Sequence, residues 1–252
     1  METALKERFI RLWRKYFGPA DLPIVFFYTD EKPAAETPPG RCIIQGIYRV
    51  LEGRDAVFDA ETARCAGGRR YAGFTSEVMP DFEYFLSCGI PGKLEGERYK
   101  KSPELVREFM RLGPELKAPA KYLVFKRWDK VGEEIPEAVV FFARADVLSG
   151  LFTLANFDRP DMDGAYSPFG AGCSTAILYP RLERNAALPR AVLGMFDVSA
   201  RPFVGEDRLS FSVPFNRFLT MIGNMEDSFL VTDSWKAVLR RIQKTELENM
   251  KC

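Results

Sequence analysis

The sequence predicts a single compact domain of the mixed α/β or α+β class, with a mixed sheet and flanking helices. Three observations support this prediction. The chain has 252 residues, enough to bury one sizeable core. Hydrophobic residues make up 46% and charged residues 28%, which is typical of a globular protein. Short apolar strand patterns are interspersed with helical patterns along the chain, which favours strands and helices that share one core.

The individual elements follow from apolar spacing and from start and stop signals. Apolar residues at helical spacing predict an amphipathic helix within residues 1–17. Ser102 can cap a helix that opens with Pro103, and Asp146 can cap a later one over 147–155. Further helices are predicted over 43–51, 80–88, 215–225 and from 233 or 234 onward. Strands are predicted over 23–28, 56–58, 122–125, 138–143, 191–196 and 209–213.

A weak internal duplication is one interpretation of this order. Strands that begin near Val25 and Val140 carry the same apolar triplet, and each precedes a glycine-rich turn with a cysteine. If the duplication is real, the halves meet near residues 115–120 and the two cysteine turns face each other. Chance recurrence of a short apolar strand is the alternative.

Composition and charge exclude several classes of function. The formal net charge is +1, so no overall field directs the protein to nucleic acid. The chain contains no histidine, which excludes imidazole-based catalysis and mixed Cys/His zinc sites. No apolar run is long enough to span a membrane, and the first residues do not resemble a signal peptide. We therefore expect a cytoplasmic protein whose cysteines are thiols or metal ligands rather than disulfides.

Two glycine-rich turns, residues 65–68 and 170–173, contain a cysteine each and mark the candidate site. Because glycine has no side chain, another group can approach the backbone closely there. A thiol in such a turn can meet a ligand, a metal or a second thiol. We expect the two turns to face a common hollow, and the glycines expected to line it are Gly67, Gly68, Gly170 and Gly172.

One interpretation of the cysteines is a metal centre. Four thiolates from separate loops can hold an iron–sulfur cluster or zinc, although this chain has no CxxC spacing. The candidate ligands are Cys42, Cys65, Cys88 and Cys173.

Two other interpretations stay open. The protein could be an enzyme or sensor for a small anionic molecule, with Cys65 or Cys173 as the thiolate. Arg69, Arg70 and Arg201 would then orient the ligand, because the guanidinium fork matches carboxylate and phosphate groups. Alternatively, the cysteines are small buried hydrophobes in a structural or partner-binding protein. The sequence does not decide the ligand, the reaction or the oligomeric state.

An acidic loop is a weaker candidate for ion binding. Asp158, Asp161 and Asp163 crowd one segment, and such oxygen ligands can bind calcium or magnesium. The segment lacks the closing glutamate of a calcium-binding loop, which argues against this interpretation.

The order of these features resembles a known family. A strand like 23–27 precedes Arg41-Cys42 at a helix start and the Cys65-x-Gly67-Gly68 turn. A strand like 139–142, the turn that ends in Cys173, and Leu193-Gly194 before Arg201 complete the series. Over about residues 5 to 230 this succession resembles the prokaryotic family called domain of unknown function 169.

The resemblance implies no activity that can be transferred. It does imply cysteines at the positions of Cys42, Cys65 and Cys173, and often a fourth at the position of Met195. The thioether of Met195 cannot act as a thiolate. Cys88 could substitute for it in space, or the cluster could be lacking in this member of the family.

Overall fold

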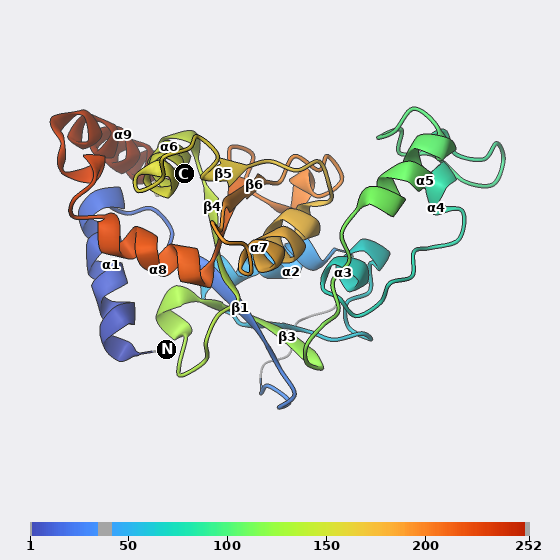
Figure 1. The fold of residues 1–252 in the computed structure, drawn as a ribbon, viewed down its shortest axis with the longest axis horizontal. Helices are drawn as coiled ribbons and strands as arrows, with labels where there is room; N and C mark the ends of the chain where they lie inside the picture. The colour runs from blue at the N-terminus through green and yellow to red at the C-terminus, as the bar shows by residue number, and fades with distance from the viewer. Residues whose placement is uncertain (1, 35–41, 250–252) are drawn as a thin grey trace.

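Within the described part of the chain, seven strands form one sheet in the order β2-β3-β1-β4-β7-β6-β5 (Figure 1). The computed structural model describes residues 2–34 and 42–249. Neighbouring strands are antiparallel except for β5 and β6, which are parallel, so the sheet is mixed. The strands are β1 (Ile24–Thr29), β2 (Ala56–Phe58), β3 (Tyr122–Arg127), β4 (Ala138–Ala143), β5 (Ala165–Tyr166), β6 (Ala191–Gly194) and β7 (Leu209–Pro214).

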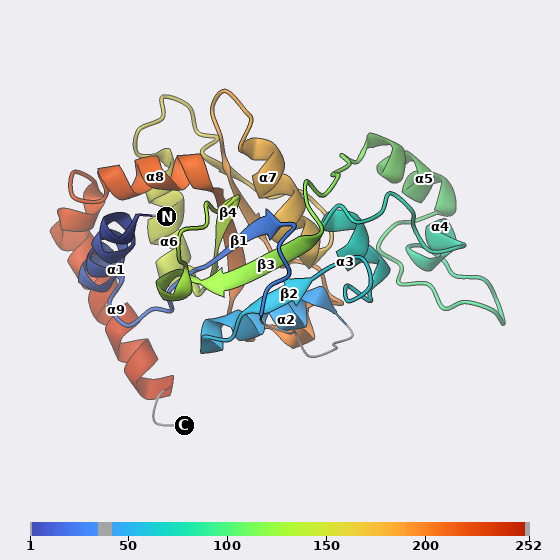
Figure 2. The same cartoon turned by 90° about the horizontal axis from the view of Figure 1, so that it is seen from below.

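The helices of the described residues lie on both faces of the sheet and in a lobe beside it (Figures 1 and 2). A π-helical segment, Ser174–Leu178, leads directly into α7. The α-helices are α1 (Thr3–Phe17), α2 (Ile43–Arg49), α3 (Ala66–Tyr71), α4 (Phe82–Phe85), α5 (Pro103–Leu112), α6 (Ala145–Asn156), α7 (Tyr179–Glu183), α8 (Phe215–Asn224) and α9 (Asp233–Asn249).

Strands β1 and β4 are apolar along almost their whole length because both faces of the sheet are buried there. Side chains alternate between the faces of a strand. Val25 and Val139 therefore enter one core cluster, while Phe26 and Val140 enter the other. This explains why β1 and β4 appear in the sequence as continuous apolar runs without alternating polar residues.

The first core cluster packs α1, α6, α8 and α9 against the sheet. Trp13 stacks on Phe17, with ring centroids 4.2 Å apart, and Phe17 meets the edge of Trp235 from α9. Gly150 on α6 lies so close to the Trp235 ring that a β-carbon there would overlap it. The second core cluster lies on the opposite face, where α2 and the π-helical segment pack, with Cys42 and Cys65 at its margin.

Residues 74–117 form a lobe that contains α4 and α5 and projects from the body, opposite α1 and α9 (Figures 1 and 2). Its two ends meet where Ala118 N–H donates to the carbonyl of Gly73 at 2.9 Å. Gly73 has φ +81°, and a β-carbon there would lie 2.5 Å from the nitrogen of Ala118. The lobe also contacts the body through Tyr99, whose hydroxyl accepts from Ser199 N–H at 2.9 Å.

The predicted α+β class and single compact domain are confirmed. All the predicted strands are present, and Ser102 caps α5 as predicted, accepting from Leu105 N–H at 3.4 Å. The prediction that Asp146 caps α6 is wrong, because the helix starts two residues earlier than predicted, at Ala145, and Arg144 holds the cap position. The internal duplication and its boundary near 115–120 remain predictions. No helix of residues 2–34 and 42–249 is both long and apolar enough to cross a membrane.

Candidate functional site

Three cysteines from distant parts of the chain lie at the starts of three helical segments on the same face of the sheet. Cys42 immediately precedes α2, Cys65 precedes α3, and Cys173 precedes the π-helical segment. All three belong to the second core cluster, where Cys173 is buried and the other two are partly exposed. The fold therefore brings the two glycine-rich turns together and adds Cys42 to them.

The sulfur of Cys65 is the acceptor at the centre of this group. Gly68 N–H donates to Cys65 Sγ at 3.2 Å, and the Ile43 backbone N–H and the Cys42 thiol donate to the same sulfur. The hydrogen bond from Cys42 is the largest cause that lowers the pKa of Cys65, to about 6, and the backbone amides act in the same direction against burial. Cys65 is therefore the thiol most readily converted to thiolate.

The other two thiols are held in the protonated form. The hydrogen bond to Cys65, together with burial, raises the pKa of Cys42 far above the ordinary thiol value. Cys173 is only 5% exposed, and burial, the negative charge of Cys65 and that of Asp197 all raise its pKa. The site therefore has one acceptor sulfur, one donor thiol and one buried thiol.

Glycine is required at position 68 by the close approach of Cys65. A β-carbon on Gly68 would lie 2.6 Å from Cys65 Sγ and 3.1 Å from Cγ2 of Ile43. At the neighbouring Gly67 the nearest atoms belong to the Tyr71 ring, at 3.8 Å, which is an ordinary contact. Of these two glycines, therefore, only Gly68 makes room for the sulfur, and Gly67 does not.

The second turn is held by Asp197 and packed against Met195. Gly172 N–H donates to Asp197 Oδ2 at 3.0 Å, and a β-carbon on Gly172 would lie 2.8 Å from Met195 Sδ. Met195 is fully buried in the same core cluster as Cys173 and has φ +69°, an unusual backbone conformation for this residue type. The thioether of Met195 therefore packs against Gly172, the residue before Cys173.

A hollow of about 210 Å³ opens beside the second turn. It is flanked by Phe169 and Phe196, which are 56% and 57% exposed. Gly170 and Gly194 form part of its wall. Of the two cysteine turns only 170–173 contributes to this hollow, but a smaller pocket is lined both by Arg70, two residues after the first turn, and by Gly170 of the second.

The three candidate arginines differ in their surroundings. Arg70 forms an ion pair with Glu115 at 3.1 Å and so ties α3 to the base of the lobe. Arg201 donates to backbone carbonyls of residues 205, 206 and 208 and holds that loop. Arg69 is exposed to solvent on α3, one helical turn after Cys65. Arg69 is therefore the arginine best placed to meet a ligand beside the thiolate.

The residues do not assemble into the predicted four-thiolate centre. Cys88 is exposed in the lobe, where its thiol donates to the carbonyl of Gly89 at 3.4 Å. Across residues 2–34 and 42–249, no three His, Cys, Asp or Glu side chains are placed to hold a metal ion. Zinc or an iron–sulfur cluster thus remains a prediction that this arrangement does not support.

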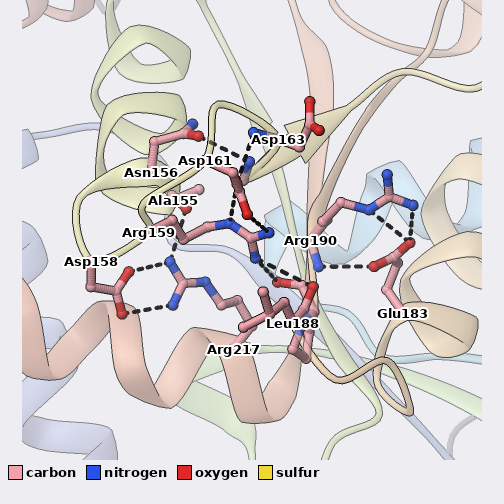
Figure 3. A network of polar contacts seen from close by, with 12 residues as sticks. Ala155, Asn156, Asp158, Arg159, Asp161, Asp163, Glu183, Leu188, Arg190 and Arg217 are labelled. Carbon is pink, nitrogen blue, oxygen red and sulfur yellow. Dashed lines mark hydrogen bonds and ion pairs between the residues drawn. The ribbon is translucent and has the colours of Figure 1, made fainter.

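Two carboxylates of the acidic loop, those of Asp158 and Asp161, are paired with arginines (Figure 3). Asp158 accepts from both terminal nitrogens of Arg217, at 2.9 and 2.5 Å, and Asp161 pairs with Arg159 at 2.9 Å. Arg217 is almost fully buried and also donates to the carbonyl of Ala155. Asp158 thus fastens the loop to α8, whereas Asp161 pairs within the loop, and both carboxylates have their charges balanced by arginines.

Sequence reasoning did not find that Cys42 and Cys65 are direct partners. Each cysteine immediately precedes a helix. Helix starts present free N–H groups to a side-chain acceptor, so this position in the sequence was the signal that could have indicated the contact. Asp197, which holds the second turn, carried no motif that could have marked it.

The fold and site define a single-domain α+β protein with a cluster of three free cysteines at helix starts. The chain belongs to the family domain of unknown function 169, described as "Uncharacterised ArCR", which matches residues 14–224. Comparisons with curated proteins and with solved structures give no match.

Proposed function

We propose that this protein is a thiol-dependent enzyme or sensor whose reactive group is the Cys65 thiolate. The observation that carries the proposal is the convergence of two backbone amides and the Cys42 thiol on Cys65 Sγ. Hydrogen bonds of this kind stabilise negative charge on sulfur, and the thiolate is the nucleophilic form of cysteine. With a pKa of about 6, most of Cys65 is ionised at neutral pH.

The proposed substrate is a small molecule that carries negative charge. Arg69 lies on α3 four residues after Cys65, the cap residue of that helix, and its side chain is exposed to solvent. A guanidinium there can pair with a carboxylate or phosphate while the sulfur attacks a neighbouring atom. The cytoplasmic location expected from the sequence would keep the thiols reduced between reactions.

The pH dependence of alkylation tests this proposal. Purified protein is treated briefly with iodoacetamide between pH 4 and 10, and each cysteine-containing peptide is quantified by mass spectrometry. We expect the Cys65 peptide to be labelled with a midpoint near pH 6, and Cys173 to be protected by burial. Exposed Cys88 serves as the internal reference for labelling. A Cys65 that stays unlabelled up to pH 8 would contradict the proposal.

Stability should change with pH in the direction that this pKa requires. The folded-state pKa of Cys65 is below its ordinary value of 9.0, so between about pH 6 and 9 the unfolded chain binds a proton that the folded chain lacks. The contribution of Cys65 to stability is therefore complete above pH 9 and is lost as the pH falls towards 6. We expect wild type and Cys65→Ser to differ most in urea midpoint at pH 9.

A further inference from the structure

We propose that Cys42 and Cys65 form a dithiol that exchanges with small disulfides, with Cys65 as the attacking thiol and Cys42 as the resolving thiol. This inference rests on the proposed nucleophilic role of Cys65 and adds the substrate class and the second reacting group. Its basis is the packing of the two helix starts: Cys65 Sγ and the Ile43 side chain lie 2.6 and 3.1 Å from the β-carbon position of Gly68. Cys42 directly precedes Ile43, and hydrogen bonding between the two thiols acts on both of their pKa values.

The backbone fixes this pair of cysteines in place. Ile43, the residue after Cys42, donates its N–H to Cys65 Sγ, and its side chain packs against Gly68. The starts of α2 and α3 are therefore interlocked. Cys42 and Cys65 both have extended backbone conformations, with ψ 137°, that place no strain on the side chain. A disulfide between them requires the two sulfurs to approach to a bond length of about 2.05 Å.

Accessibility separates this pair from the third thiol. Cys42 and Cys65 are partly exposed, whereas Cys173 is 5% exposed and lies in the core cluster. A small disulfide can therefore reach the Cys42–Cys65 pair from solvent. Cys88 is exposed but lies in the lobe, where its thiol is bonded to its own loop.

The exchange balances in two steps. The Cys65 thiolate attacks a disulfide RSSR, so a bond forms between Cys65 Sγ and one sulfur and the other leaves as the thiolate RS⁻. Cys42 then gives its proton to solvent or to RS⁻ and attacks Cys65 Sγ in the mixed disulfide. The Cys42–Cys65 bond forms and the second RS⁻ leaves. Two protein thiols are oxidised and one RSSR is reduced to two RSH.

The experiment uses the full-length protein with two disulfides, glutathione disulfide and the uncharged 2-hydroxyethyl disulfide. Wild type, Cys42→Ser, Cys42→Ala and Cys173→Ser are incubated with each probe, and circular dichroism verifies that every variant is folded. Intact mass and released thiol are measured without reductant. We expect wild type and Cys173→Ser to release two thiols from the Cys42–Cys65 pair and to lose two hydrogens there, with any mixed disulfide on exposed Cys88 counted separately by peptide mapping.

Both Cys42 variants should stop at the mixed disulfide on Cys65 and release one thiol from this site. We expect the mixed disulfide to last at least about 100-fold longer in them than in wild type, because an adjacent thiol acts at high effective concentration. Faster reaction with glutathione disulfide than with the uncharged probe would additionally support the anionic substrate class.

Two outcomes would overturn the inference while leaving the proposed function intact. One is a stable mixed disulfide on Cys65 in wild type, which would show that Cys42 does not resolve it. The other is a Cys65–Cys173 disulfide in wild-type peptide maps, which would assign resolution to the buried thiol. If Cys65 fails to react with either probe in every folded variant, the proposed function itself is refuted together with the inference.

Discussion

Replacing Gly68 with alanine tests the arrangement of the thiolate site most directly. The new methyl carbon would lie 2.6 Å from Cys65 Sγ, well inside van der Waals contact. The sulfur is the end of a short side chain, so rotation of Cys65 relieves the overlap more easily than movement of α2. That rotation breaks the hydrogen bond from the residue 68 amide, which is 3.2 Å long in the wild type.

The expected effect is large on the thiol and small on the fold. A hydrogen bond to a charged group contributes about 1.5–3 kcal/mol, which corresponds to about 1–2 pH units in the titration of the sulfur. The alkylation midpoint of Cys65 should therefore move upwards by that amount from about pH 6. Overpacking costs about 1–3 kcal/mol of stability, and the better helix propensity of alanine returns about 1 kcal/mol.

The assay is the alkylation profile described above, combined with urea denaturation of the same samples. Gly67→Ala is the matched control, because it adds the same methyl group to the same helix with only the Tyr71 ring at 3.8 Å nearby. We expect this control to leave the alkylation midpoint unchanged. An unchanged midpoint in folded Gly68→Ala would refute the view that the residue 68 amide helps set the ionisation of Cys65.

The remaining predictions concern the scaffold. Asp158→Asn removes the carboxylate from Arg217, whose side chain is 8% exposed, and should lower the free energy of unfolding by about 3 kcal/mol in urea denaturation. The exposed Asp163 on the same loop is the control, and a loss as large in Asp163→Asn would contradict this assignment. Gly150→Ala places a methyl group against the ring of Trp235 in α9 and should lower the free energy of unfolding by about 1–3 kcal/mol. Gly223→Ala, with open space around it, should be neutral or stabilising by up to about 1 kcal/mol, so equal losses in the two variants would refute the packing argument.

Most strands were predictable because they are short, largely apolar runs bounded by turn residues. The predicted limits 56–58 and 138–143 coincide with β2 and β4. Strand β4 buries both of its faces, so its apolar character does not depend on knowing its partners. The pairing itself was not predictable, since β1 lies between β3 and β4, which begin 98 and 114 positions after it (122 − 24 and 138 − 24).

Two helices next to the candidate site were not predicted. Residues 65–68 were interpreted as a glycine turn, yet Gly67 and Gly68 lie in α3. Glycine disfavours helix locally, but Gly68 is needed there because a side chain would overlap Cys65. The segment after Cys173 was missed because 174–178 is buried on all sides and shows no amphipathic period.

The candidate site was predicted in part. The sequence identified the turns that contain Cys65 and Cys173 and expected Cys42 and Cys88 beside them. The fold places Cys42 against Cys65 and puts Cys88 in the lobe. Arg70 and Arg201 were expected to meet a ligand because of their charge, but their partners are a glutamate and a set of carbonyls. Such partners depend on tertiary structure and leave no local pattern in the sequence.

The two ends of the lobe lie next to each other, and this determines where the length of the chain can vary. Segment 74–117 leaves and re-enters the body at Gly73 and Ala118, which are joined by one hydrogen bond. None of the strands lies within it, so an insertion or deletion between these two points would leave the sheet register unchanged. The entropic penalty of closing such a loop grows only slowly with its length. The length of the lobe can therefore vary without altering the sheet, whereas its contacts with the site through Glu115 and Tyr99 depend on those two residues being kept.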